Sequence, residues 1–195
     1  NPIASGSIIS LTLPFNYTFF SPSTDSAIFE VVNHINATPD DNRLNDTIRF
    51  YQRFYNYYAY DDGTAEAGYG LNAIGAQLAY RFTLDQPDTL RAIQMYFNQQ
   101  LNDVSQEAFY LTIWDEAGGP GNTLYQKAGV KPVYEDSLNK FHTYIIDSVI
   151  VLSDTFYVGW VQTTENILNI GFDRNINSNA HMFYNVTGIW QNSIL

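Results

Sequence analysis

The sequence contains no cysteine among its 195 residues, which excludes disulfide bonds, thiolate metal sites and cysteine nucleophiles. It is also poor in positive charge, because 9 Lys and Arg stand against 20 Asp and Glu and give a net charge of -11. Phosphate-backbone binding needs a basic patch, so we expect no nucleic-acid partner. No apolar run approaches the roughly 20 residues that a membrane-spanning helix needs, so we expect no membrane span.

Aromatic residues are abundant, with 15 Tyr, 13 Phe and 3 Trp. Tyr and Phe, like the β-branched residues, favour pleated and half-buried surfaces, so this composition indicates strands. The length allows one ordinary domain or two small ones. The chain opens on Asn1 and closes on Leu195 with neither an initiator Met nor a signal peptide, which predicts a piece of a longer precursor.

Several segments alternate apolar and polar residues with a period of two or carry strand-forming runs, and none has a convincing helical period. Expected strands cover residues 93–97, 109–114, 156–161 and 169–173. The nearly continuous apolar run 144–151 predicts a strand buried on both faces. Gly, Pro, Asn and Asp mark loops between the strands, at residues 85–88, 116–122 and 152–154. The expected fold class is therefore all-β.

Residues 1–56 differ from the remainder of the chain and form a smaller N-terminal β piece. They contain four expected strands, at residues 7–13, 16–20, 27–35 and 47–55. Four strands are too few for a complete immunoglobulin-type sandwich. The piece is therefore either the last half of an immunoglobulin-like domain or a donor of strands to the sandwich that follows.

A family resemblance begins at residues 57–70, with the sequence YYAYDDGTAEAGYG. This block resembles the opening of a jelly-roll-like module of large secreted Bacteroidota proteins, which often precedes a type IX secretion sorting domain. Segments 109–114, 118–121, 156–162, 169–173 and 188–190 are similar to later parts of that module. The resemblance implies a jelly-roll-like, two-sheet antiparallel sandwich over residues 57–195, preceded by a partial immunoglobulin-like domain over residues 1–56.

The function expected on this basis is a non-catalytic extracellular accessory module for adhesion or carbohydrate binding within a larger secreted or cell-surface protein. Its partners would be a polysaccharide or a cell-surface protein, together with neighbouring domains of the same polypeptide. The alternative is a structural spacer that presents a neighbouring enzyme or sorting domain. A glycan-active hydrolase or lyase is the third reading, because sandwich folds host many unrelated functions.

The sequence shows no motif for catalysis. His34, His142 and His181 are far apart, and none has a metal-ligand neighbour at helical spacing. Adjacent acidic residues do not form a glycosidase pair, because neighbours on a strand point to opposite faces and a glycosidase needs two carboxylates facing across a cleft. We therefore do not expect an enzyme.

Two groups of residues are candidates for binding. Asp61, Asp62 and Glu66 cluster around a Gly turn and supply hard oxygen ligands of the kind that suits a structural Ca²⁺ ion. The alternative is that Asp62 and Gly63 make a turn and Glu66 faces water. Trp114 and Trp190 are candidate sugar-stacking platforms, although Trp114 could equally close the edge of the sandwich.

Overall fold

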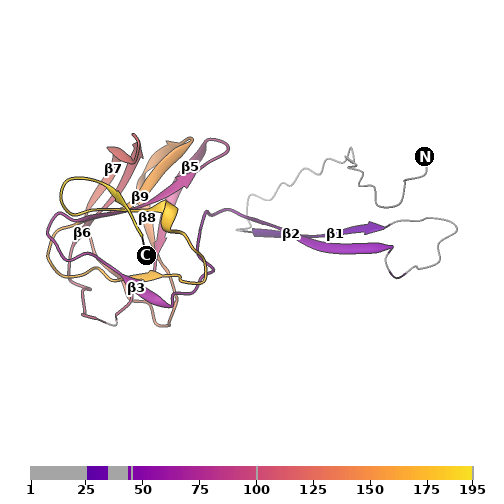
Figure 1. Cartoon of the computed structure of the whole chain (residues 1–195), viewed down its shortest axis with the longest axis horizontal. Helices are drawn as coiled ribbons and strands as arrows, with labels where there is room; N and C mark the ends of the chain where they lie inside the picture. Colours follow the sequence, from indigo (N-terminus) through magenta and orange to yellow (C-terminus); the bar gives the residue numbers. More distant parts are fainter. Residues whose placement is uncertain (1–25, 35–43, 45, 100, 195) are drawn as a thin grey trace. The chain divides into compact units, whose positions relative to one another are not determined.

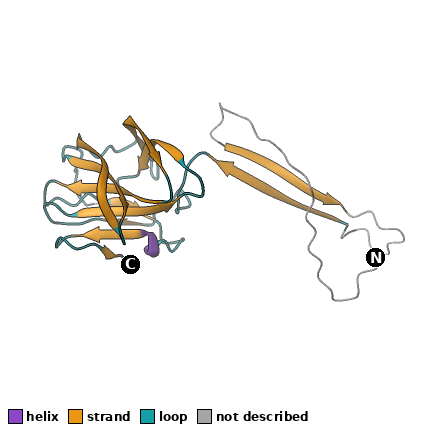
Figure 2. Cartoon of the chain, turned by 90° about the horizontal axis from the view of Figure 1, so that it is seen from above, coloured by secondary structure: helices purple, strands orange, loops and turns teal. Residues whose placement is uncertain are grey.

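The computed structural model describes residues 26–34, 44, 46–99 and 101–194, and this part of the chain is all-β (Figure 1). Strands and their connections make up nearly all of it, with one short 3₁₀ helix, η2 (Asn179–His181), drawn in purple in Figure 2. No helix in the described ranges is long and apolar enough to cross a membrane. The chain divides into two compact units, Asn1–Tyr57 and Tyr58–Leu195.

The first unit contains an antiparallel pair of strands, β1 (Ser26–His34) and β2 (Thr47–Tyr55). The pairing runs without interruption from Ser26 opposite Tyr55 to His34 opposite Thr47. These two strands confirm the strands expected at residues 27–35 and 47–55. The strands expected at residues 7–13 and 16–20 lie outside the described residues, and the immunoglobulin-like identity of this unit stays a prediction.

The larger layer of the second unit is a six-stranded antiparallel sheet. Its order is β12-β11-β4-β9-β6-β7, so β9 lies at the centre with β4 and β6 on its two sides. The strands are β4 (Gln77–Thr83), β6 (Phe109–Glu116), β7 (Pro120–Val130), β9 (Thr155–Gln162), β11 (Met182–Asn185) and β12 (Gln191–Asn192).

The other layer is built from two antiparallel pairs, β3 (Ala67–Tyr69) with β10 (Ile170–Phe172) and β5 (Asp88–Met95) with β8 (His142–Leu152). Backbone contacts beyond the end of β5 join the two pairs. Phe97 forms an antiparallel bridge with Ile170, and the Gly171 N–H donates to the Tyr96 carbonyl oxygen at 2.7 Å.

One apolar core lies between these two layers. Strands of the six-stranded sheet contribute Leu111, Ile113 and Trp160, and the other layer contributes Ile93 and Ile146, all of them buried. Two layers that enclose one core are the arrangement of a β-sandwich, so the expected all-β fold is confirmed. The jelly-roll connectivity stays a prediction.

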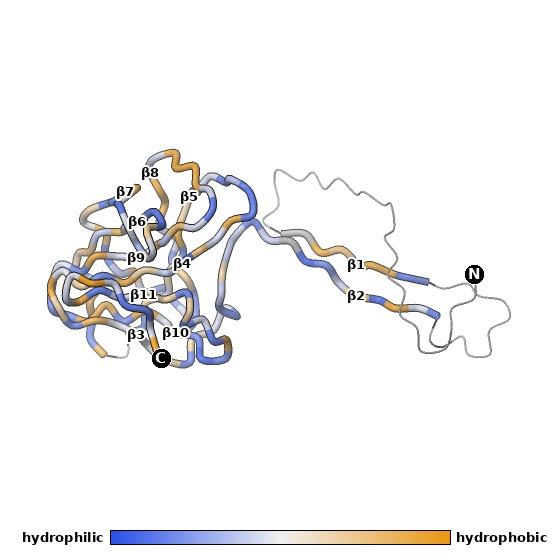
Figure 3. The backbone as a smooth tube through the Cα atoms, turned by 45° about the horizontal axis from the view of Figure 1, so that its top comes forward, coloured by the Kyte–Doolittle hydropathy of each residue, from blue (hydrophilic) through white to orange (hydrophobic). Residues whose placement is uncertain are grey.

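The expectation that residues 144–151 are buried on both faces is wrong. This segment lies in β8, which is strongly hydrophobic in sequence (Figure 3), yet its side chains alternate between core and surface. Ile145, Val149 and Val151 are 62%, 86% and 66% exposed, whereas Tyr144 and Ile146 are buried. In the described structure β8 pairs only with β5 and packs on the core with one face, so a β-branched run here does not mean a buried strand.

The loop expected at residues 116–122 is present but shorter than expected, because a tight hairpin connection covers only residues 117–119. β6 ends at Glu116 and β7 begins at Pro120. The Glu116 carboxylate accepts the backbone N–H groups of Gly118 and Gly119 at 2.7 and 3.0 Å. Both glycines adopt positive φ, which lets the chain reverse within three residues. The Gly- and Pro-rich sequence therefore marks a turn and the start of a strand.

Candidate functional site

An acidic cluster forms where the segment before β3 meets the loop after β10. One carboxylate oxygen from each of Asp62, Glu66 and Asp173 lies within 4.8 Å of the other two. Asp62 and Glu66 are exposed, whereas Asp173 is buried. The sequence-based site residues Asp62 and Glu66 therefore lie together, 107 to 111 positions from the third acid.

Asp61 does not belong to this cluster. Its carboxylate accepts the Gly63 N–H at 3.0 Å, which is a local turn contact. Asp173 is the third acid of the cluster in place of Asp61, and it was missed because it stood at the end of the expected strand 169–173, far in sequence from Asp62 and Glu66.

Hydrogen bonds hold the cluster in shape. Asp173 accepts three backbone N–H groups, from Asp62 at 2.9 Å, Asn175 at 2.6 Å and Ile176 at 3.1 Å. The Thr64 hydroxyl donates to Asp62 at 2.6 Å, and this bond is the main cause that lowers the pKa of the Asp62 carboxyl. Within the part of the chain that the structure describes, none of the three acids forms an ion pair with a Lys, Arg or His side chain.

The donor set of the cluster fits a hard divalent cation. It offers oxygen ligands from three carboxylates and the Thr64 hydroxyl, and the Asn175 side-chain NH₂ group donates to Asp62 at 3.2 Å and to Glu66 at 3.1 Å. Oxygen ligands of this kind bind Ca²⁺ or Mg²⁺, and nothing in the arrangement selects one of them.

The two candidate tryptophans pack against each other. The Trp114 and Trp190 rings are 5.5 Å apart between centroids in an edge-to-face arrangement, with Trp190 half-buried. Trp114 is only 4% exposed and packs with Ala79 and Tyr157. An exposed stacking platform at Trp114 is therefore wrong, because the ring is covered. Ligand binding at Trp190 stays a prediction.

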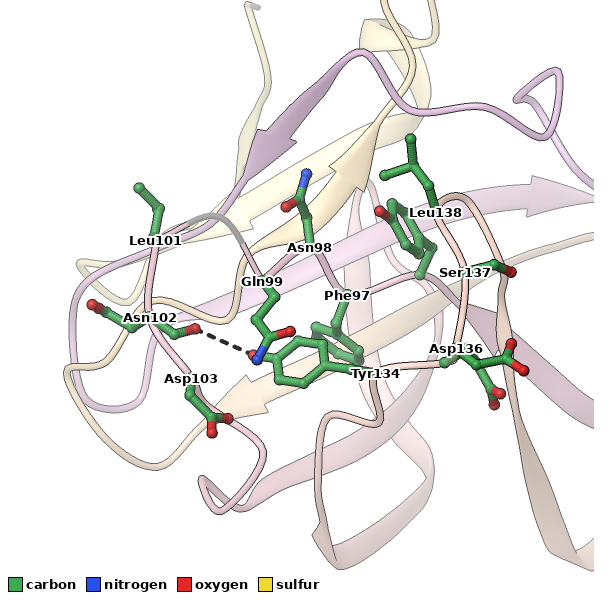
Figure 4. Close-up of a pocket in the computed structure, with 12 residues that line it drawn as sticks. Phe97, Asn98, Gln99, Leu101, Asn102, Asp103, Tyr134, Asp136, Ser137 and Leu138 are labelled. Atoms are coloured by element: carbon green, nitrogen blue, oxygen red, sulfur yellow. Dashed lines mark hydrogen bonds between the residues drawn. The ribbon is translucent and has the colours of Figure 1, made fainter.

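An open groove of about 610 Å³ lies between the chain that follows β5 and the loop between β7 and β8 (Figure 4). Residues 98, 99 and 101–103 form one side and residues 136–138 the other, with Phe97 and Tyr134 between them. Side-chain amides, carboxylates, a hydroxyl, aromatic rings and leucines line it: Tyr96, Phe97, Asn98, Gln99, Leu101, Asn102, Asp103, Tyr134, Glu135, Asp136, Ser137 and Leu138. We call these residues the 98–138 groove.

Tyrosine hydroxyls fix the loops that border the groove. The Tyr134 hydroxyl accepts the Val104 N–H at 3.0 Å and donates to the Asn102 carbonyl oxygen at 3.3 Å (Figure 4). The Tyr144 hydroxyl accepts the Val133 N–H at 3.2 Å and donates to the Lys131 carbonyl oxygen at 3.0 Å. Tyr134 therefore joins its own loop to the loop that follows β5, and Tyr144 joins the Tyr134 loop to β8, so these bonds position the groove before any ligand arrives.

The three carboxyl groups of the groove all have lowered pKa values. The main cause is the Ser105 backbone N–H for Asp103, the hydrogen bond with His142 for Glu135, and the hydrogen bond from Lys140 for Asp136. All three are therefore carboxylates at neutral pH and accept hydrogen bonds. A glycosidase acid needs a raised pKa, so these groups suit binding better than proton donation.

The three histidines occupy separate environments. His34 lies 3.1 Å from the Thr47 hydroxyl, and His142 lies 2.6 Å from Glu135. The His181 ring stacks on Tyr60 with 3.9 Å between ring centroids. These are two hydrogen bonds and one ring-stacking contact, and no histidine belongs to the group of possible metal ligands found among the described residues.

Sequence reasoning missed the 98–138 groove. Its two sides are polar stretches, each ordinary for a loop, and only the pairing of β5 with β8 brings them together. Tyr134 stands in a segment of the sequence that matches neither a strand pattern nor a motif. No protein-family model, curated protein or solved structure matches this chain significantly.

Proposed function

We propose that the second unit is a non-catalytic accessory module that binds carbohydrate in the 98–138 groove, as part of a larger extracellular or cell-surface protein. The observation that carries the proposal is the lining of this groove, in which amides and ionised carboxylates surround aromatic rings. Amide and carboxylate groups form hydrogen bonds with sugar hydroxyls, and the half-buried Tyr134 ring offers an apolar face to the ring carbons, whereas Tyr96 and Phe97 are buried beneath it. The Bacteroidota resemblance supports the extracellular setting.

Removing two groove amides should weaken this binding. Gln99→Ala with Asn102→Ala keeps the Asn102 backbone carbonyl that accepts the Tyr134 hydroxyl, so the loop keeps its anchor. Each lost hydrogen bond is worth about 1 kcal/mol, so we expect affinity to fall about tenfold or more. Affinity electrophoresis against a broad polysaccharide panel measures this. Gln86→Ala, before β5 at its far end, is the matched control and should not change retardation.

Two results would contradict the proposal. Polysaccharide binding that the double variant leaves unchanged would place the site elsewhere, with Trp190 the next candidate. No binding across the panel would favour the alternative function, a structural spacer that presents a neighbouring enzyme or sorting domain.

We propose in addition that the acidic cluster holds a structural Ca²⁺ ion. Asp62 and Glu66 would supply exposed ligands, and Asp173 would supply the buried one. An ion bound only by the folded state stabilises it, by about 2.7 kcal/mol at 100 times the dissociation constant. The ion would fix the segment before β3 to the loop after β10 and would take no part in a reaction.

Adding Ca²⁺ to chelator-treated protein should therefore raise the melting temperature, by an amount on the order of 5–10 °C at saturation. The variant Asp62→Asn with Glu66→Gln should lose this response, because it removes two of the three charges. Asp85→Asn, at an exposed turn, should keep it. A melting temperature that does not respond to Ca²⁺ in the unmodified protein contradicts the ion, whereas a stronger response to Mg²⁺ contradicts only its identity.

A further inference from the structure

We infer that the 98–138 groove takes uncharged or amine-bearing glycans and rejects glycans that carry uronic, sialic or sulfate groups. This inference rests on the proposed function and names the chemical class of its ligand. It follows from the charges of the side chains that line the groove.

The groove lining contains three carboxylates and no Lys or Arg side chain: Asp103, Glu135 and Asp136. Their pKa values are lowered, so all three are ionised at neutral pH. The neighbouring cation is Lys140, which lies 2.6 Å from Asp136 and 3.7 Å from Glu135. One cation therefore offsets one of three negative charges.

Lys131 is not part of the groove lining, and within the described residues it forms no ion pair with the groove carboxylates. Lys131, in the loop between β7 and β8, donates to the Gln106 side chain at 3.0 Å. Asp103, on the opposite side of the groove from Lys140, is exposed, and its carboxylate interacts with Ser105, whose N–H it accepts at 2.9 Å. This leaves Asp103 able to accept a hydrogen bond from a sugar hydroxyl or an ammonium group.

An anionic sugar in this groove would meet like charge at short range. Charges within a Debye length, about 8 Å at physiological salt, are not fully screened. The chain as a whole carries a net charge of -11, which adds long-range repulsion for a polyanion. A neutral or amine-bearing chain meets no such barrier, and its hydroxyl or ammonium hydrogens match the acceptors of the lining.

The experiment is affinity electrophoresis at low salt with three sets of probes. Neutral probes are β-glucan, xylan, mannan and chitin oligomers; the amine-bearing probe is chitosan; anionic probes are polygalacturonate, alginate, hyaluronan and heparin. We expect retardation by at least one neutral or amine-bearing probe, lost in the Gln99→Ala, Asn102→Ala variant, and at least tenfold weaker retardation by every anionic probe.

Charge removal provides the second arm. Asp103→Asn with Asp136→Asn removes two negative charges but keeps oxygen acceptors, so binding of the anionic probes should strengthen at least fivefold relative to the neutral ones. Asp85→Asn is the matched control and should leave this ratio unchanged.

The outcomes separate the two proposals. An anionic probe that binds as tightly as any other, with its binding lost in the Gln99→Ala, Asn102→Ala variant, overturns the charge selectivity but leaves the sugar-binding function standing. An unchanged ratio in the Asp103→Asn, Asp136→Asn variant also overturns the selectivity. Absence of all binding overturns the proposed function and the inference together.

Discussion

Replacing Gly159 by Ala should destabilise the second unit by about 3–5 kcal/mol, the largest effect we expect of any single methyl group added to this protein. Gly159 lies at the centre of β9, between Ala79 of β4 and Thr112 of β6. A Cβ there would overlap the Leu78 carbonyl oxygen and lie 2.9 Å from the Ala79 Cα. Backbone atoms of paired strands cannot move aside without breaking the hydrogen bonds between the strands. No low-energy shift of the structure can therefore relieve the clash.

Gly129→Ala is the matched control, because it tests backbone conformation without a clash. Gly129 has φ of +72° in β7, and a Cβ there would meet nothing within 4 Å. That substitution should cost about 1–2 kcal/mol. Urea unfolding followed by tryptophan fluorescence reports on the second unit, since Trp114, Trp160 and Trp190 all belong to it. Equal destabilisation by the two substitutions would show that the close approach at Gly159 is not a constraint.

Replacing Asp173 by Ala should lower the free energy of unfolding of the second unit by about 2–4 kcal/mol. The Asp173 side chain, 7% exposed, accepts the backbone N–H groups of Asp62, Asn175 and Ile176, and an Ala leaves all three without this acceptor. Hydrogen bonds to a charged group are worth about 1.5–3 kcal/mol, and buried donors left unpaired add a penalty. The loss should appear in the absence of any metal, since it concerns the bonds within the chain.

Asp173→Asn separates the hydrogen bonds from the charge. The amide oxygen can still accept from the Asn175 and Ile176 N–H groups, but the amide nitrogen would face the Asp62 N–H. The free energy of unfolding should therefore fall less for Asp173→Asn than for Asp173→Ala. Asp85→Ala at an exposed turn should change the free energy of unfolding by less than about 0.5 kcal/mol. If Asp173→Ala behaves like Asp85→Ala in metal-free protein, Asp173 does not anchor the two segments.

Some strands could be predicted from sequence because apolar residues recur at every second position. Ile93, Met95 and Phe97 recur in this way in and directly beside β5, and Phe109, Leu111 and Ile113 do so in β6, and all six are buried. β7 was missed because its sequence, rich in Gly, Lys, Gln and Asn, belongs to an edge strand with little core contact. β8 was found, but its exposed Val149 and Val151 could not be distinguished from core residues by their type.

For the candidate sites too, the sequence could not reveal which distant segments lie together. Asp62 and Glu66 were found because they share one short block, whereas Asp173 joins them only through the pairing of β3 with β10. The sequence marked Trp114 as a rare aromatic but could not reveal that Trp190 covers it. The 98–138 groove depends on two polar loops whose proximity follows from the β5–β8 pairing, a long-range contact that no local pattern encodes.

The most direct test of the central proposal is an amide chemical-shift titration of the whole chain with a polysaccharide fragment that it retains in electrophoresis. If the 98–138 groove binds sugar, the largest saturable shifts will fall at residues 96–103 and 134–138, and the Gln99→Ala, Asn102→Ala variant will lose them. Saturable shifts confined to residues around Trp190, or to neither region, would contradict a sugar site in this groove.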